Sequence, residues 1–325
     1  MKKINIIIIL SISLILLVSC TTGGKNTKTS ASGFIGGTEG ISSSISIVST
    51  SGDNKVYDSG NDPFKIQIKL ENKGEHEVKE NEVLVTLDAI NFIAYQIKDV
   101  TQPSPLILQG LRKEGTKTTS PTQAVVLFDA NYKPVIDADT SATIAANICY
   151  KYQTLSVVKD LCVRKKITGP STSTTCKVEE TKQPENSGAP FRVKIFNERP
   201  SGENKVNIYF EAENERKTGT IYTKDYLSKG KCLDVEADKN KVYIKVEFNK
   251  DDLTAAQNSA SIISCNGLSN KNEGFVNVIQ NKIQLSCNID TSGFQEQTSK
   301  IPLRITTDYV YKDSVSTTVT IKKSV

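Results

Sequence analysis

The sequence predicts an all-β protein, and three observations point to this fold class. Apolar and polar residues alternate with a period of two from Ile41 onward, which is typical of strands with one buried and one solvated face. Turn-forming residues interrupt this pattern at intervals of about eight to twelve residues, as in β-sandwiches. No long stretch has a helical period, and only residues 251–260 are expected to form a short helix. These observations favour antiparallel sheets packed face to face.

Each predicted strand carries an apolar face that we expect to point into a core. In the first half these faces are Phe64-Ile66-Ile68-Leu70, Val83-Val85-Leu87, Val125-Leu127 and Ile144-Ala146-Ile148-Tyr150. In the second half they are Ile208-Phe210-Ala212, Ile244-Val246-Phe248, Ile283-Leu285-Cys287-Ile289, Leu303-Ile305 and Val319-Ile321. The tyrosines Tyr150, Tyr152, Tyr309 and Tyr311 are expected to point inward with these faces.

An internal repeat indicates a duplicated domain. The stretch Ser51–Val56 matches Ser201–Val206 almost residue for residue, and each copy leads into an alternating strand. Each half ends with a Tyr-x-Tyr strand, which we expect to be followed by a turn and a last Val/Ile strand. Such ordered self-similarity predicts two sister β-sandwiches, at 41–168 and 189–325. The Pro-, Gly- and Ser-rich stretch 169–188 is the predicted linker between them.

The start of the chain has the layout of a secretory signal peptide, with Lys2 and Lys3 before an apolar run of about thirteen residues. That run is shorter than the roughly twenty residues that a membrane-spanning helix needs. The ending Leu17-Val18-Ser19-Cys20 resembles the lipobox of prokaryotic lipoproteins. The resemblance implies that residues 1–19 are removed and that Cys20 carries the lipid. Residues 20–40 are rich in Thr, Gly, Ser and Lys, which predicts a flexible tether.

A second resemblance concerns the sandwiches. The stretch Leu70-Glu71-Asn72-Lys73-Gly74, followed by the strand at Val83–Leu87, resembles the strand, Asn-x-Gly turn, strand pattern of prokaryotic immunoglobulin-like adhesion-type modules. In the second half Asn214-Glu215-Arg216 replaces Asn-Lys-Gly. The resemblance implies two tandem immunoglobulin-like antiparallel β-sandwiches after the signal peptide and tether. It implies a fold and no particular activity.

Six cysteines remain once Cys20 is assigned to lipid, and an even number outside the cytosol indicates disulfides. Six cysteines allow fifteen pairings. Alternation places Cys149 and Cys162 outward on what we expect to be consecutive hairpin strands, which favours a bridge between them. Cys265 is then expected to pair with Cys287, and Cys176 with Cys232. The alternative is a set of free thiols.

The chemistry-bearing residues give no sign of an enzyme. His76, the sole histidine, is expected in a solvated turn, so a site with several histidine ligands is excluded. Ser156 and Lys159 have the Ser-x-x-Lys spacing of penicillin-binding enzymes, but they lie in a strand context instead of at the start of a helix. Asp53, Asp58 and Asp62 form an oxygen-rich loop and are weak calcium candidates. We expect no catalytic residue and no cofactor other than the lipid on Cys20.

Composition limits the partners. The net charge of +5 falls to +3 without Lys2 and Lys3 (39 basic minus 36 acidic residues), and no basic run stands out, so nucleic acid is not expected. We therefore predict a lipid-anchored, extracytoplasmic protein at the cell membrane or outer surface. It is expected to act as a binding, adhesion or structural module with a protein or glycan partner. The alternatives are an accessory subunit of an envelope complex engaged by β-strand pairing, and a surface enzyme with an unrecognised acidic site.

Overall fold

The computed structural model describes residues 33–52, 54–115, 117–168, 176–229, 232, 235–253, 258–295 and 297–324. From residue 33 onward the chain belongs to one compact unit. The predicted signal peptide, Cys20 and Asp53 lie outside the described residues. Within these residues, no helix is both long and apolar enough to cross a membrane.

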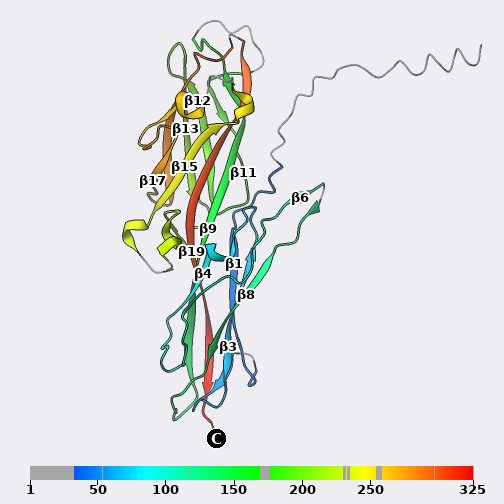
Figure 1. Cartoon of the computed structure of the whole chain (residues 1–325), viewed down its shortest axis with the longest axis vertical. Helices are drawn as coiled ribbons and strands as arrows, with labels where there is room; N and C mark the ends of the chain where they lie inside the picture. Colours follow the sequence, from blue (N-terminus) through cyan, green and yellow to red (C-terminus); the bar gives the residue numbers. More distant parts are fainter. Residues whose placement is uncertain are drawn as a thin grey trace, which may run out of the picture. The chain divides into compact units, whose positions relative to one another are not determined.

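The predicted all-β class is confirmed, since the described chain consists of sheets whose strands pair antiparallel, except that β2 pairs parallel with β19 (Figure 1). One sheet contains β1 (Ile41–Val48), β3 (Phe64–Asn72) and β8 (Gln123–Ala130), and another contains β10 (Glu180–Lys182), β12 (Phe191–Pro200), β13 (Lys205–Asn214), β18 (Lys282–Asp290) and β16 (Ile263–Cys265). The largest sheet has the order β17 (Glu273–Asn277), β15 (Lys241–Phe248), β19 (Ser299–Lys322), β9 (Thr140–Val163), β4 (Val83–Asp88) and β5 (Thr101–Pro103).

Shorter elements complete the fold. In the largest sheet, β11 (Glu185–Asn186) pairs with β9, while β14 (Thr220–Tyr222) and β2 (Lys55–Tyr57) pair with β19. The strands β6 (Lys113–Glu114) and β7 (Lys117–Thr118) form a separate hairpin. The helical turns are η1 (Glu80–Glu82), η2 (Tyr226–Lys229), η3 (Glu236–Asp238), η4 (Lys250–Asp252) and α2 (Ser259–Ile262). The short helix predicted at 251–260 is thus represented by η4 and the start of α2.

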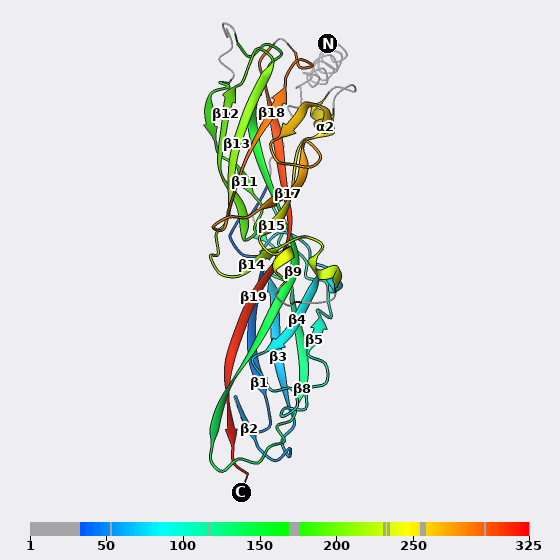
Figure 2. The same cartoon turned by 90° about the vertical axis from the view of Figure 1, so that its left-hand side faces the viewer.

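The two halves of the sequence repeat one strand order. The first half contains β1-β3-β8 and the second contains β12-β13-β18, with antiparallel pairing in both (Figure 2). The repeated segments both begin in the connection between the first strand of that order and the second, and both end in a strand: Lys55 and Val56 lie in β2, and Lys205 and Val206 in β13. The internal repeat therefore corresponds to equivalent places in the two halves.

The strands β9 and β19 join the two halves. Each is 24 residues long, and they pair antiparallel from Thr140 opposite Ile321 to Val163 opposite Ser299. The start of β9 pairs with β4, and its end pairs with β11. The start of β19 pairs with β15, whereas its end pairs with β2 of the first half. The last strand of each half therefore pairs with strands of both halves.

The turn predicted after each Tyr-x-Tyr stretch is absent, so that prediction is wrong. The residues after Tyr152 are Gln-Thr-Leu-Ser, and those after Tyr311 are Lys-Asp-Ser-Val. Neither stretch contains glycine or proline, and each continues the strand that precedes it, so nothing interrupts the ladder. The described part of the predicted linker is also ordered, because 176–188 includes β10 and β11.

The predicted inward faces are buried with one exception. Of the apolar faces predicted from alternation, Val125 and Leu127 are 40% and 41% exposed, whereas their neighbours Val126 and Phe128 are buried. Every residue from Ala124 to Phe128 is apolar, so alternation did not define a face there. The larger Phe128 ring occupies the core, and this places Val125 and Leu127 outside.

Four tyrosine rings occupy the point where β9 and β19 cross from one half to the other. Tyr150, Tyr152, Tyr309 and Tyr311 are at most 1% exposed, so the predicted inward orientation is confirmed. Tyr150 lies opposite Tyr311, and Tyr152 lies opposite Tyr309, with ring centres 5.6 and 6.4 Å apart. We call this place, where the four rings meet, the waist.

The disulfides confirm one predicted pair and correct two. Cys265 is bonded to Cys287, as predicted, but Cys149 is bonded to Cys232 and Cys162 to Cys176. Cys149 and Cys162 lie on the single strand β9, 13 positions apart or about 43 Å, which no disulfide can span. Cys149 does lie on the face opposite Tyr150, but Tyr222, Tyr226 and Leu227 cover it there.

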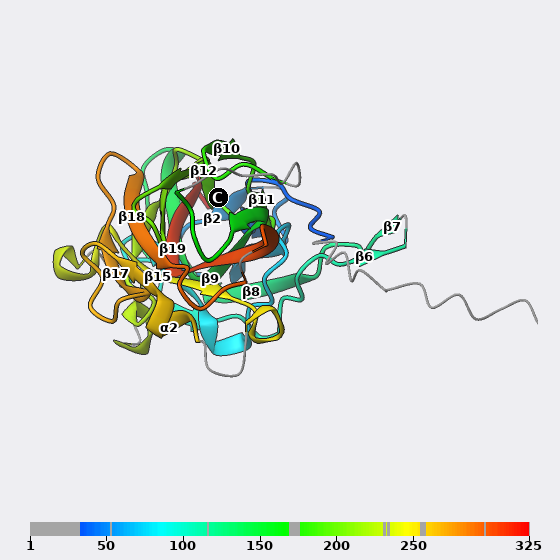
Figure 3. The same cartoon turned by 90° about the horizontal axis from the view of Figure 1, so that it is seen from above.

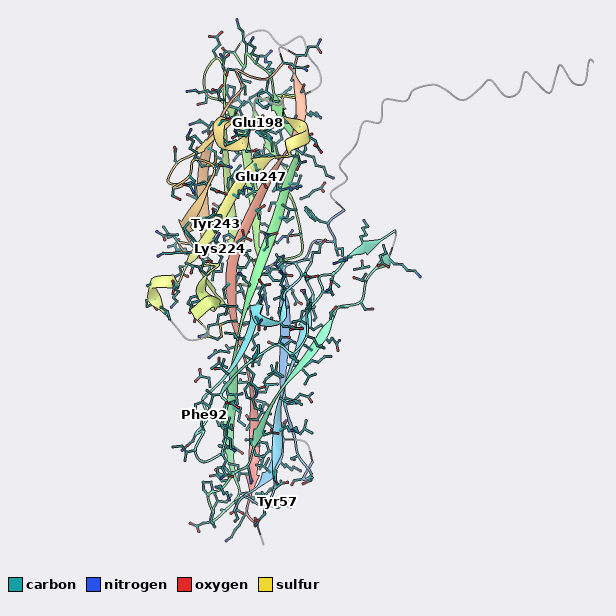
Figure 4. All side chains as sticks on the ribbon, in the orientation of Figure 1. Tyr57, Phe92, Glu198, Lys224, Tyr243 and Glu247 are labelled. Carbon is teal, nitrogen blue, oxygen red and sulfur yellow. A yellow bond between two sulfur atoms is a disulfide. The ribbon has the colours of Figure 1, made fainter. Side chains whose placement is uncertain are left out.

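A buried glutamate and a buried lysine lie close together beside the Cys162–Cys176 bridge. Glu198 on β12 is completely buried, and its carboxylate accepts the Cys162 N–H at 2.9 Å (Figure 4). The Lys182 ammonium lies 3.7 Å away and is shared with Glu180 and Asp160. Burial raises the pKa of Glu198 from 4.5 to about 8, against the attraction of Lys182.

This raised pKa predicts that the protein loses stability as the pH rises from about 4.5 to 8, because the folded state holds a proton on Glu198 that the unfolded state releases. We expect Glu198→Gln to flatten this dependence and to raise the melting temperature at pH 8 by on the order of 5 °C. Thermal unfolding followed at several pH values measures both effects. Glu180→Gln, which removes the exposed partner of Lys182, is the control and should leave the slope unchanged. An equal slope in Glu198→Gln and wild type would refute the assignment.

The shared strands predict that neither half folds alone. We expect residues 33–168 and 176–325, expressed separately, to show no cooperative unfolding, because each lacks the strand that covers part of its core. Co-expression should restore a single cooperative transition, measured by circular dichroism. A cooperative transition in either half by itself would contradict this prediction.

Candidate functional site

A cavity of about 500 Å³ lies beside the waist. Five segments line it: the described N-terminal residues, the loop after β3, the β6–β7 hairpin with its approach, the middle of β9, and the segment after β11. The lining residues are Gly33, Phe34, Glu75, His76, Leu111, Arg112, Lys113, Gly115, Gln153, Leu155 and Ser187. Its volume falls within the roughly 300–1,000 Å³ of small-molecule sites. Figures 1 and 3 show the hairpin β6–β7 projecting from the rest of the described chain.

Glu75 holds the segments of the cavity together. Its carboxylate accepts the backbone N–H groups of Ile35 and Gly36, both at 3.0 Å, and that of Gly188 at 2.5 Å. Hydrogen bonds to a charged acceptor are stronger than neutral ones. One side chain therefore binds the N-terminal segment and the predicted linker to the loop after β3. The described end of the predicted tether, residues 33–40, is consequently attached to the body of the protein.

Glycine is required where these segments meet. A Cβ atom on Gly74 would lie 2.0 Å from the Tyr152 hydroxyl and 2.5 Å from the Gly188 carbonyl oxygen. A Cβ atom on Gly188 would lie 2.6 Å from the Gly36 carbonyl oxygen. These contacts are too close for any side chain, so the two glycines allow the backbones to approach each other.

His76 belongs to this cavity and is not the solvated turn residue that the sequence predicted. Its ring packs edge-to-face on Tyr152, with ring centres 5.3 Å apart. Burial lowers the pKa of His76, and this outweighs the opposite influence of Glu82 and Asp308. The imidazole is therefore neutral at pH 7 and offers one hydrogen-bond donor and one acceptor.

Polar groups on β9 and after β11 complete the wall. The Gln153 amide donates to Asp308 of β19 at 2.7 Å, which fixes its orientation. The Ser187 hydroxyl accepts the Leu155 N–H at 3.0 Å, and its own proton is left to donate. These groups suit a ligand with several hydroxyl or carbonyl groups.

Basic residues stand at the rim. The Arg112 side chain is 67% exposed and lies 3.8 Å from Glu77, while its Nη2 donates to Gln109 at 3.2 Å. Lys113 is exposed beside it at the start of β6. Among the lining side chains, Arg112 and Lys113 carry two positive charges against the one negative charge of Glu75, so the formal charge of the lining is positive.

The residues singled out for catalysis and calcium have other partners. Ser156 is buried and donates to Asn186 at 2.6 Å, while Lys159 pairs with Glu185 at 2.5 Å. Hydrogen bonds from Ser324 and from the Ile136 backbone lower the pKa of Asp58 to about 2. Burial opposes ionisation of Asp62, but bonds from Ser51, Thr50 and Tyr57 lower its pKa overall. These side chains thus fasten the surrounding loops.

A second place that a ligand could stack on is an aromatic pair on β15 and β17, formed by the half-buried Tyr243 and the exposed Phe275. Tyr243 and Phe275 pack edge-to-face with ring centres 5.1 Å apart. The Lys224 ammonium lies 3.5 Å from the centre of the Tyr243 ring and covers it (Figure 4). A cation in this position already uses the ring face that a ligand would stack on.

Sequence reasoning missed most of this site. Glu75, Gln153 and Ser187 lie in different segments, and no local motif links them. Glu75 was visible only as a neighbour of His76, and Gly188 only as a linker glycine. Models of known protein families and the sequences of curated proteins give no match to the chain. The assignment of the site therefore depends on its geometry.

The role of Glu75 in joining the segments of the cavity can be tested by substitution. We expect Glu75→Gln to lower the free energy of unfolding by about 2–3 kcal/mol, because the amide NH₂ would face backbone donors that now have a charged acceptor. Chemical denaturation measures the change. The matched control is Glu77→Gln, whose side chain is 39% exposed and whose loss should cost at most about 0.5 kcal/mol. Equal effects of the two substitutions would show that Glu75 does not hold the segments together.

Proposed function

We propose that this protein is a lipid-anchored, extracytoplasmic binding protein that takes an acidic glycan into the cavity at the waist. The proposal rests chiefly on one observation: a cavity of ligand size that combines a basic rim, apolar patches and fixed hydrogen-bonding groups. Sugar rings present C–H faces and many hydroxyl groups, so they need both apolar and polar contacts.

The lining residues divide accordingly. Phe34 and Leu111 provide apolar surface, His76, Gln153 and Ser187 provide hydrogen bonds, and Arg112 with Lys113 attracts a carboxylate. In this proposal the protein binds without catalysis, and the Glu75 carboxylate serves to hold the walls of the cavity through three backbone N–H groups.

Location supports the same proposal. Three disulfides indicate an oxidising compartment. The lipobox-like stretch ending at Cys20 supports attachment to a membrane through lipid, and the described chain starts beside the cavity at Gly33. An anchored protein of this kind would hold its ligand close to the membrane surface.

A titration tests the binding site. We expect a uronic-acid tetrasaccharide to bind the protein, and Arg112→Glu/Lys113→Glu to weaken binding at least about tenfold, since two attractive charges become repulsive. Isothermal titration calorimetry gives the affinities. Lys98→Glu changes an exposed lysine that does not line the cavity and should bind like wild type.

Two results would contradict the proposal. Equal affinity in Arg112→Glu/Lys113→Glu and wild type would exclude this cavity, and absence of binding by the wild type would exclude the acidic glycan. The anchor is checked separately by mass spectrometry of the N-terminal peptide, where an unmodified Cys20 would contradict it.

A further inference from the structure

The strand β8 has an open edge. It is the last strand in the order β1-β3-β8, and its register with β3 continues without a bulge from Gln123 opposite Glu71 to Ala130 opposite Phe64. In the part of the chain that the structure describes, no strand pairs with its other side.

The hydrogen-bond pattern shows which groups face that open side. The Asn72 N–H donates to the Thr122 carbonyl at 3.0 Å, so the even-numbered residues of β8 bond to β3. The odd-numbered residues therefore direct their N–H and C=O groups away from β3. Asn131 agrees with this parity, because its N–H donates to the Tyr95 carbonyl on the outer side. The edge is open from Gln123 to Asp129.

The second half covers the equivalent edge. There, β18 occupies the place of β8, and β16 pairs antiparallel along its outer side from Ile263 to Cys265. The Cys265–Cys287 bridge fastens β16 to β18. The comparison shows that this fold accommodates an antiparallel strand at the position beside β8 that no strand of the described residues fills.

The open edge also lacks the usual protection against pairing. Natural edge strands are commonly shortened, bulged, or interrupted by lysine or proline. The sequence of β8 is Gln-Ala-Val-Val-Leu-Phe-Asp-Ala, without lysine or proline. Its outward side chains include Val125 and Leu127, which are 40% and 41% exposed. A mostly apolar edge of this length favours pairing with another strand.

We propose that β8 pairs antiparallel with β8 of a second copy of this chain. The register that places Val125 opposite Leu127 of the second copy is complementary throughout. On the outer face Gln123 then meets Asp129, and on the inner face the small Ala124 meets the large Phe128. In this register each odd-numbered residue of one β8 lies opposite an odd-numbered residue of the other, so the free backbone N–H and C=O groups of the two edges can bond to each other. No two side chains of like charge lie opposite each other. The product is a continuous six-stranded sheet across two copies.

Sedimentation velocity of the purified full-length protein in detergent tests this pairing. We expect the wild type to form dimers, and Val125→Lys and Leu127→Glu each to weaken dimerisation about tenfold, because two symmetric cross-strand contacts are lost. A mixture of the two variants should recover the dimer, since the lysine introduced in one copy then faces the glutamate introduced in the other. The control Val135→Lys, at an exposed position outside β8, should dimerise like wild type.

Each outcome decides the proposal. A wild type that stays monomeric overturns it and would leave β8 to a strand from a different protein. A dimer that survives both single substitutions overturns the assignment to β8. Failure of the mixture to recover the dimer, with both variants melting like wild type, overturns the register.

Discussion

The antiparallel ladder between β9 and β19 is the constraint on which the rest of the structure depends. It runs unbroken through both halves apart from one irregularity between Ile301 and Leu303. Because each strand begins in its own half and ends in the other, the buried residues of both halves form one core cluster. The ladder also brings the two Tyr-x-Tyr stretches together, so equivalent residues of the two halves pack against each other at the waist.

The duplication gives the waist two related junctions that differ in a few residues. The Tyr152 hydroxyl lies 3.2 Å from the Asn72 amide oxygen, and Tyr311 makes the corresponding contact with Asn214 at 3.3 Å. After Asn72 the chain continues with Gly74, which allows close approach of the backbones, and with Glu75, which lines the cavity. After Asn214 it continues with Arg216, which pairs with Asp313 at 2.9 Å. A bulky cation thus occupies the second junction, whereas the first retains a cavity.

The fold class followed from alternation, because most strands have one apolar and one polar face. Alternation failed at β8, where both faces are apolar and only the space in the core decides that Phe128 points inward. It also failed to show that β9 is continuous. The sequence has no turn signal after Tyr152, but we expected short strands and therefore placed a turn there. That error produced the wrong Cys149–Cys162 pair. The cavity was beyond local patterns because its residues are brought together only by the crossing of β9 and β19.

The exchange of terminal strands has a consequence for resistance to proteolysis. Proteases cleave chains that open, and proteins usually open first in their least stable subdomain. Here the end of β19 pairs with β2 and the end of β9 pairs with β11, so detaching either half also strips a strand from the other. Cleavage in the sheets then requires nearly complete unfolding, so resistance to proteolysis follows the global free energy of unfolding, or the unfolding rate where cleavage is faster than refolding.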